Sequence, residues 1–120
     1  SRNLHTVVDE IYALSIHDKD NEEFQSVIKI LNNNLGNDVH FLWGLSKDFS
    51  ASGFRVGVLY TQNQLLNDAI DGFNLFSSVS EPMQNVVADL LMDNDFVDNF
   101  LDISRNRLKS SYFIVTTALD

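Results

Sequence analysis

The sequence contains no cysteine, a single proline, and only 8 lysine and arginine residues against 17 aspartates and glutamates. Without cysteine there is no disulfide framework and no thiolate metal site, which fits an intracellular protein. The net charge of −9 argues against a broad nucleic-acid surface and against binding to anionic membranes, since both need clustered positive charge. No apolar run approaches the length of a membrane span. We therefore expect a cytoplasmic protein that binds neither nucleic acid nor a membrane.

The sequence also offers little for a metal ion. His5, His17 and His40 lack metal-ligand spacing, and the acidic segment 93–95 lacks the glycine and glutamate of a calcium loop. We expect no metal site and predict that the acidic segment starts a helix. The three basic residues of segment 105–109 are predicted to form a solvated helix face.

What the chain does contain is enough apolar material for a core, with 44% hydrophobic and 11% aromatic residues. Runs of β-branched and aromatic residues predict strands over 4–8, 39–43 and 54–60. Helical spacing predicts helices over 24–31, over 61–73 from a capping box at Thr61, from Ser80, and from about Asp95 to the end. Segment 17–23 is predicted to be a loop. This order of elements favours an α/β fold with a mostly parallel sheet.

Both ends of the chain lack the usual boundary signals. The first predicted strand starts almost at the first residue, and the last helix runs to Asp120 without a stop signal. Three strands also make a thin sheet with edges that need covering. We therefore expect a piece of a larger protein.

Positive charge is unusually placed in the middle of the chain. Between Ile30 and Ser104, the only side chains of fixed positive charge are Lys47 and Arg55. Lys47 is predicted to lie in a loop just beyond a strand, where α/β proteins gather ligands, and a lysine there can act as a Schiff-base nucleophile. Arg55 offers a fork of donors for a phosphate, and Ser46 adds a hydroxyl. Taken alone, a lysine in a loop is more often a solvated charge.

A second candidate group follows the first predicted strand. Asp9 could keep a ring nitrogen protonated, and Tyr12, three residues later, could reach a ring oxygen. An aspartate in this place is more often a cap or turn residue. Glu10, on the other face of the strand, is predicted to be structural, and Trp43 is predicted to belong to the core.

The combination is more specific than its parts. The stretch GLSKDFSASGFRVG (44–57) resembles the signature around the pyridoxal-phosphate (PLP) lysine of class I and II aminotransferases, which are fold-type-I PLP enzymes. VVDEIY (7–12) is similar to the segment that contacts the cofactor ring in that family. Within the family, both stretches are most similar to 1-aminocyclopropane-1-carboxylate (ACC) synthase and ACC synthase-like proteins. The resemblance covers essentially the whole chain and about the middle third of such an enzyme.

The resemblance implies a role for each candidate residue. Lys47 would hold PLP as a Schiff base and then move the proton at the substrate Cα. Asp9 would pair with the pyridinium nitrogen, and Tyr12 would donate a hydrogen bond to the ring's phenolic oxygen. Ser46 and Arg55 would hold the 5′-phosphate.

The resemblance also implies an incomplete site. Many relatives carry a phosphate-binding serine where this chain has Gly44, so we expect a looser phosphate grip. Residues 1–94 would be part of the PLP-binding large domain, and residues 95–120 a long helix leading toward a small domain that is missing here. The family is dimeric and borrows site residues across the dimer, so we expect a homodimeric parent and no activity from these 120 residues alone.

Two classes of function remain open. The first is an enzyme that transforms a small amino acid, either by transamination to a 2-oxo acid or, with S-adenosylmethionine as substrate, by γ-elimination that closes a cyclopropane. The second is a non-catalytic or truncated aminotransferase-like interaction module.

Overall fold

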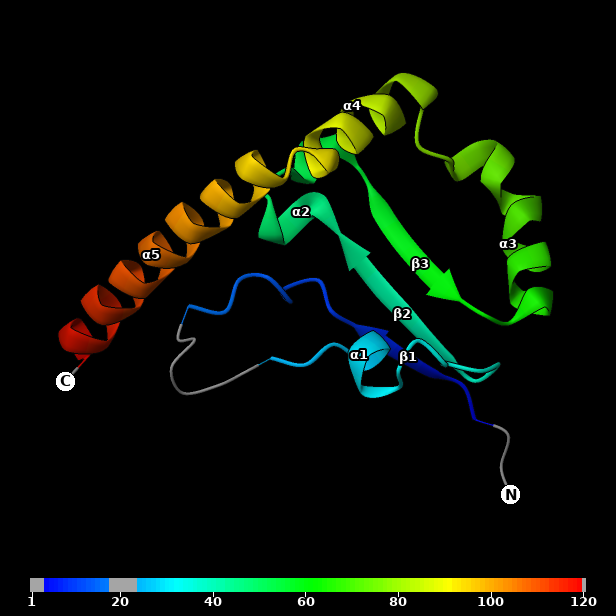
Figure 1. Ribbon diagram of the computed structural model, residues 1–120, viewed down its shortest axis with the longest axis horizontal. Coiled ribbons are helices and arrows are strands. Elements are labelled where there is room, and N and C mark those ends of the chain that lie inside the picture. The colour runs from blue at the N-terminus through cyan, green and yellow to red at the C-terminus, as the bar shows by residue number, and fades with distance from the viewer. Residues whose placement is uncertain (1–3, 18–23, 120) are drawn as a thin grey trace. The chain divides into compact units, whose positions relative to one another are not determined.

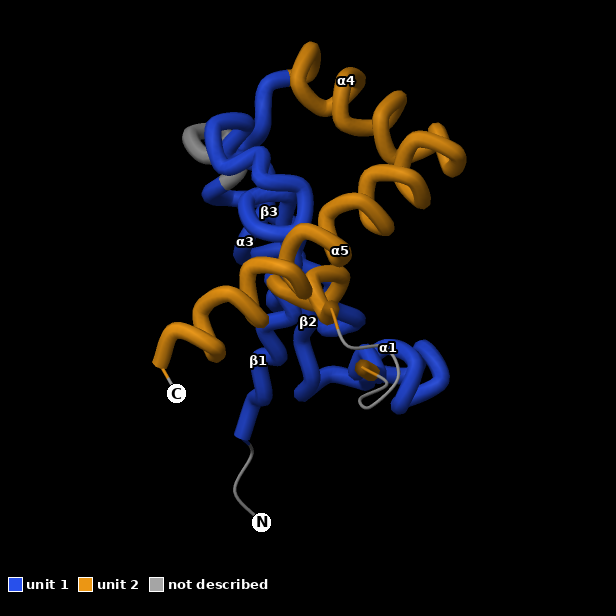
Figure 2. Tube along the Cα trace, turned by 90° about the vertical axis from the view of Figure 1, so that its left-hand side faces the viewer, with its two compact units in different colours: residues 1–11, 25–80 blue, residues 12–24, 81–120 orange. Residues whose placement is uncertain are grey.

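The structure, a computed structural model, describes residues 4–17 and 24–119 (Figure 1). In chain order its elements are β1 (Thr6–Asp9), α1 (Val27–Ile30), β2 (Val39–Gly44), α2 (Leu45–Asp48), the 3₁₀ turn η1 (Ser52–Phe54), β3 (Gly57–Thr61), α3 (Gln64–Ser77), α4 (Glu81–Met92) and α5 (Asn94–Leu119). Except for His17, the predicted loop over 17–23 lies outside the described residues. The chain forms two compact units, unit 1 from residues 1–11 and 25–80 and unit 2 from residues 12–24 and 81–120 (Figure 2).

Unit 1 contains a three-stranded sheet in the order β1-β2-β3 (Figure 1). β1 and β2 are parallel, with Asp9 opposite Leu42, whereas β2 and β3 are antiparallel, with Gly44 opposite Gly57. The predicted α/β elements are present, but in this part of the chain the sheet is mixed rather than mostly parallel. The connection from β2 to β3 contains only the single turns α2 and η1, whereas a parallel pair is usually joined by an α-helix that returns the chain to the other end of the sheet.

The first helix is shorter than predicted. Helical spacing runs from residue 24 to residue 31, but α1 is a single turn. It starts at Val27 rather than at residue 24, because Ser26 is its cap and the Oγ of Ser26 accepts the N–H of Ile28 at 3.3 Å. Its end is close to the predicted one, since Asn32 and Asn33 follow with left-handed φ values of 49° and 61°, which no α-helix can continue.

The start of α3 also differs from the prediction. Thr61 is the last residue of β3 rather than the helix cap, and the helix begins at Gln64. The cap is Asn63, whose Oδ1 accepts the backbone N–H of Leu66 at 3.0 Å. The Gln64 side chain donates forward to Asp68 at 2.7 Å instead of reaching back. The predicted capping box is therefore wrong.

Unit 2 contains α4 and α5, and both begin where the sequence predicts. α4 starts at Glu81 with Pro82 in its first turn, and α5 starts at Asn94. Asp93 caps α5, because its Oδ1 accepts the N–H of Phe96 at 3.0 Å. The predicted role of the acidic segment 93–95 as a helix start is confirmed.

The predicted basic face of segment 105–109 in α5 is only partly exposed to solvent. Arg107 is exposed, whereas Arg105 is half-buried and its Nε donates to the carbonyl oxygen of Leu14 at 2.9 Å. His17 lies edge-on to Tyr112 with ring centroids 4.9 Å apart. These two contacts tie the segment after β1 to α5 inside unit 2, so the prediction of a solvated face is wrong for Arg105.

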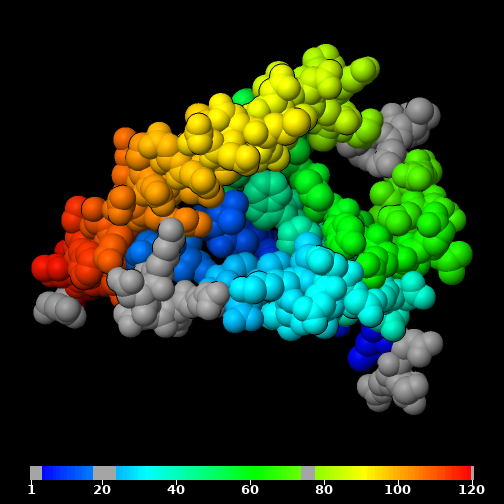
Figure 3. Space-filling view, in the orientation of Figure 1, coloured from blue at the N-terminus to red at the C-terminus, as the bar shows by residue number. Residues whose placement is uncertain are grey.

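Much of the apolar surface of unit 2 is uncovered. In the space-filling view, much of the surface of α5 (orange to red) is open to solvent (Figure 3). Its last turns carry Tyr112, Phe113, Ile114 and Val115, all at least 54% exposed. None of the helices in residues 4–17 and 24–119 combines the length and apolarity needed to cross a membrane.

Candidate functional site

The topology of unit 1 gathers four of the five predicted site residues at one edge of the sheet. β1 ends at Asp9, and the parallel β2 leads directly into α2, which carries Ser46 and Lys47 (Figure 1). β3 starts back from this same edge, because it is antiparallel to β2, and Arg55 lies two residues before its first residue, Gly57. Tyr12, the fifth, belongs to unit 2.

Lys47 lies in a helical turn rather than in the predicted loop. α2 buries Leu45 and Asp48, leaves Ser46 half-buried and exposes Lys47. The turn is closed by the N–H of Ala51, which donates to the carbonyl oxygen of Leu45 at 3.1 Å. A single turn is not stable by itself, so the buried side chains hold it in place.

Arg55 has an unusual backbone for a residue with a side chain. Its φ of 55° and ψ of 39° are left-handed, a conformation that costs a non-glycine residue about 1–3 kcal/mol. Its Nη1 donates to the carbonyl oxygen of Ser52 at 3.0 Å, and the residue is exposed. Backbone strain of this kind is often found at ligand-binding positions.

Asp9 combines a local turn with an exposed carboxylate. Its Oδ1 accepts the backbone N–H of Ile11 at 3.1 Å, as expected for an aspartate that follows a strand. The neighbouring Glu10 is only 6% exposed, and its Oε1 accepts the N–H of Val27 at 2.7 Å. The prediction that Glu10 is structural agrees with this contact.

One contact beside Lys47 was not anticipated from the sequence. The indole Nε1 of Trp43 donates to Oδ2 of Asp48 at 2.9 Å, and Asp48 is only 2% exposed. Trp43 is half-buried rather than fully buried, and its ring lies edge-on to Phe49. The available signal was that a tryptophan N–H usually needs a partner when its ring packs against the protein.

A second unanticipated contact lies at the other end of the sheet. His5 Nδ1 and His40 Nε2 are 2.9 Å apart, and His40 Nδ1 lies 2.7 Å from Thr61 Oγ1. His40 is only 2% exposed. No group of three or more potential metal ligands occurs within the described part of the chain. The two histidines form a hydrogen-bonded chain with Thr61.

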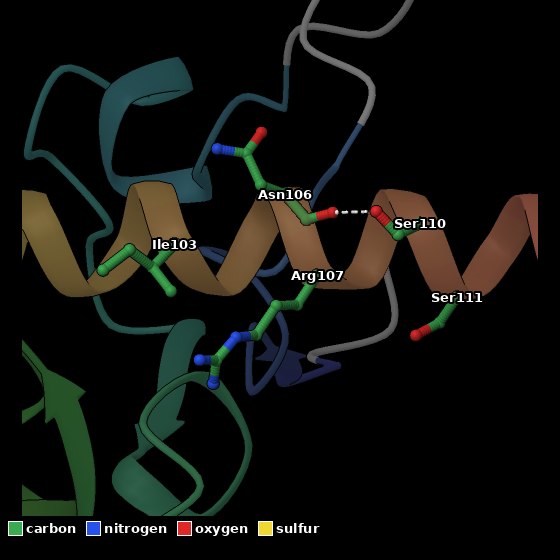
Figure 4. Close-up of a pocket in the computed structure, with 5 residues that line it drawn as sticks. All are labelled: Ile103, Asn106, Arg107, Ser110 and Ser111. Atoms are coloured by element: carbon green, nitrogen blue, oxygen red, sulfur yellow. Dashed lines mark hydrogen bonds between the residues drawn. The ribbon is translucent and has the colours of Figure 1, made fainter.

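A shallow hollow on α5 has less to offer chemically. It is lined by Ile103, Asn106, Arg107, Ser110 and Ser111 (Figure 4). Arg107 and Ser111 project to one side of the helix and Asn106 to the other, while Ser110 Oγ donates to the carbonyl oxygen of Asn106 at 3.0 Å. The polar groups do not converge on one point, so the sheet edge is the stronger candidate site.

Comparison with known proteins extends the similarity beyond the two motifs. The family model for aminotransferase class I and II matches residues 1–120. The chain is 37% identical to 1-aminocyclopropane-1-carboxylate synthase 6 of Oryza sativa subsp. japonica over 99% of its length. It is 38% identical to 1-aminocyclopropane-1-carboxylate synthase-like protein 1 of Takifugu rubripes over 97%. It is 36% identical over 98% to a human protein named "probable inactive 1-aminocyclopropane-1-carboxylate synthase-like protein 2".

The chain corresponds to only part of each relative. It covers 22%, 19% and 21% of the rice, Takifugu and human proteins, respectively. It thus spans about a fifth of their length, less than the third expected from the motifs. The match nevertheless extends over the full length of the chain, which therefore belongs to the class I and II aminotransferase family.

Proposed function

We propose that the protein is a PLP-dependent enzyme that transforms an amino acid, and that the carboxyl edge of the sheet in unit 1 is its cofactor site. The observation that carries the proposal is the strand topology. Parallel β1 and β2 and antiparallel β3 bring an amine, a carboxylate, a hydroxyl and a guanidinium to one edge of one sheet.

The chemistry of this set of groups fits PLP. The amine of Lys47 suits an aldehyde carbon, and the carboxylate of Asp9 suits a protonated ring nitrogen. The hydroxyl of Ser46 and the guanidinium of Arg55 suit a phosphate. All four residues are exposed or half-buried, so they can meet a ligand. When bound, PLP supplies an electron sink for the carbanion at the substrate Cα.

The chain's own residues would divide the work between binding and proton transfer. Lys47 is proposed as the covalent attachment point and then as the base and acid that moves the Cα proton. Asp9 is proposed to keep the ring nitrogen protonated, and Tyr12 to donate a hydrogen bond to the ring's phenolic oxygen. Arg55 and Ser46 are proposed to fix the phosphate and so orient the ring.

The relatives support an amino acid as substrate and bear on the reaction. Their names favour an ACC synthase-like reaction. We propose S-adenosylmethionine as its substrate, with transamination as the alternative reaction, and a homodimer as the working form. A non-catalytic module remains the second candidate, because a relative whose name contains "probable inactive" is as similar to the chain as the rice synthase.

The proposal is tested by locating the cofactor adduct in the full-length protein. With PLP added, we expect a visible absorption band and, after borohydride reduction, a phosphopyridoxyl group on Lys47 in the peptide mass spectrum. Lys47→Ala should lose both, whereas Lys29→Ala, which removes an exposed lysine of α1, should keep both.

The same experiment separates the candidate functions. An unchanged adduct in Lys47→Ala would show that the assignment of Lys47 is wrong. A natural protein that forms no adduct would favour the non-catalytic module. If the visible band forms, its shifts in the unreduced, PLP-loaded protein with a panel of amino acids, including S-adenosylmethionine, identify the substrate.

A further inference from the structure

The strongest unassigned feature beside the proposed site is the buried carboxylate that follows Lys47. Asp48 is 2% exposed, and burying a carboxylate is unfavourable unless hydrogen-bond donors satisfy it. Trp43 provides one such donor at 2.9 Å. Among the described residues, no buried side-chain nitrogen or oxygen lacks a hydrogen-bond partner. The hydrogen bond from Trp43 thus fixes the position of the buried Asp48 carboxylate.

This hydrogen bond connects the lysine turn to the sheet. Trp43 is paired with Val58 in the β2–β3 ladder, so its backbone is fixed by the sheet. Its ring also lies edge-on to Phe49, with centroids 6.2 Å apart and an interplanar angle of 85°. The turn between them has no side-chain cap at its N-terminus, where Gly44 stands. At that end the backbone N–H of Leu45 donates to the carbonyl oxygen of Val56 at 3.3 Å. The side-chain contacts of Asp48 and Phe49 hold the other end of the turn.

The orientation of the turn determines where Lys47 projects. Leu45, Asp48 and Phe49 are buried and lie on one face of the turn at helical spacing. Lys47 is exposed on another face. If α2 changed its orientation on the sheet, the amine of Lys47 would move with it. A misplacement of a reacting group by about 1 Å can lower a rate about 100-fold, so the orientation of α2 matters for any reaction of Lys47.

We propose that Asp48 is a positioning residue, which through its hydrogen bond with the Trp43 indole fixes the turn that carries Lys47. The inference rests on the proposed function, since it assigns a task to Asp48 only if Lys47 is the cofactor lysine. It predicts that the hydrogen bond matters, whereas the negative charge of Asp48 does not.

Three variants of the full-length protein separate these effects. Asp48→Asn keeps an oxygen that can accept the indole N–H but removes the charge. Asp48→Ala removes the acceptor, and Trp43→Phe removes the donor while keeping an aromatic ring against Phe49. Asp68→Ala in α3 is the control, because it deletes an exposed carboxylate that also accepts a side-chain hydrogen bond.

The first readout is the rate at which added PLP forms the borohydride-reducible adduct on Lys47, which we expect to fall in Asp48→Ala and Trp43→Phe but not in Asp48→Asn or Asp68→Ala. The second is turnover per folded, PLP-loaded chain, and both are measured well below the melting temperature of each variant. We expect Asp48→Ala and Trp43→Phe to lower kcat about 10- to 100-fold with little change in KM. Asp48→Asn and Asp68→Ala should stay close to the natural protein. The double variant Asp48→Ala/Trp43→Phe should be no worse than the poorer single variant, because both remove one interaction.

Each other result counts against the inference. If Asp48→Asn is as impaired as Asp48→Ala, the charge acts rather than the hydrogen bond. If Trp43→Phe turns over like the natural protein, the indole does not position the lysine. Where Asp48→Ala fails to fold, Trp43→Phe and Asp48→Asn still decide. If Lys47→Ala still forms the borohydride adduct, the proposed function itself is wrong. If Lys47→Ala loses the adduct but Trp43→Phe is unimpaired, only the role of Asp48 is wrong.

Discussion

Gly44 lies opposite Gly57 in the last pair of the β2–β3 ladder, and a Cβ atom on Gly44 would lie 3.0 Å from the carbonyl oxygen of Val56. The backbone of Gly44 is extended, so the glycine is not needed for its conformation. It is needed for space, since the crowding atom belongs to a backbone that cannot rotate away. The glycine at position 44, where the family resemblance led us to expect a serine in many relatives, thus has a local steric reason in this chain.

The crowding gives a first prediction. Gly44→Ala should lower the free energy of unfolding by about 1–3 kcal/mol, because the backbone before β3 must shift to admit the methyl group. Gly53→Ala is the matched control, since a Cβ there meets nothing within 4 Å. Urea unfolding of the full-length protein measures both changes. Equal stability of the two variants would contradict the crowding.

Gly44→Ser tests the expected loss of a phosphate contact separately from crowding. Serine and alanine crowd Val56 alike but differ in one hydroxyl. If residue 44 faces the phosphate, Gly44→Ser should bind PLP about 2- to 10-fold more tightly than Gly44→Ala, which corresponds to a hydrogen bond of about 0.5–1.5 kcal/mol. Fluorescence titration with PLP compares the two dissociation constants. Identical constants would show that residue 44 does not contact the phosphate.

The left-handed backbone of Arg55 gives a prediction in which stability and binding change in opposite directions. Arg55→Gly should be at least as stable as the natural protein, because glycine adopts a φ of 55° without strain. PLP affinity should fall about 10- to 100-fold, because a charged hydrogen-bond donor is lost. Ser50→Gly relaxes a similar φ of 51° three residues after Lys47 and should leave affinity unchanged. An unchanged affinity in Arg55→Gly would remove this arginine from the proposed site.

Asp9 and the adjacent Glu10 allow a test of the proposal that Asp9 keeps the ring nitrogen of PLP protonated. Asp9→Asn keeps an oxygen for the N–H of Ile11, so the turn after β1 should survive while the charge is lost. We expect kcat to fall about 10- to 100-fold, the effect of losing one hydrogen bond to a charged group. Glu10→Gln likewise keeps an acceptor for Val27 and should leave kcat unchanged. Steady-state kinetics with the identified substrate distinguishes them, and equal effects at both positions would exclude a special role for Asp9.

The sequence predicted best what depends on local chemistry. Pro82 and Asp93 are strong signals for helix starts, and α4 and α5 begin beside them. The strands were placed to within three residues, because β-branched runs mark them clearly. The start of α3 was misplaced because Thr61 and Asn63 are both good caps, and the pairing of Thr61 with His40 in the sheet favoured Asn63.

The residues of the candidate site were named from the sequence, but their arrangement in space was not predicted. The direction of β3 follows from the short β2–β3 connection, and this direction places Arg55 at the same edge as Lys47. The left-handed φ of Arg55 leaves no mark in the residue types, and the indole of Trp43 indicated only that some partner was needed, not that it would be Asp48. Residue types therefore provided the candidate side chains, whose roles stay predictions, and tertiary packing determined how these side chains are held.

The histidine pair at the far end of the sheet gives the last prediction. Thr61→Val keeps the shape of the side chain but removes the oxygen that lies 2.7 Å from His40 Nδ1 and that also accepts the backbone N–H of Asn63 at 3.1 Å. Because His40 is 2% exposed, its nitrogen should then be buried without this partner, and the free energy of unfolding should fall by about 1–3 kcal/mol. Thr116→Val on α5 removes a hydroxyl that bonds to the Tyr112 carbonyl in a more exposed setting, so its effect should be much smaller. Both variants are compared by urea unfolding of the full-length protein. A lower free energy of unfolding in Thr61→Val, with unchanged PLP binding, would show that the hydrogen bonds of Thr61 stabilise the sheet and do not affect the cofactor site. A loss of PLP affinity in Thr61→Val at full stability would instead show that the two ends of the sheet are coupled.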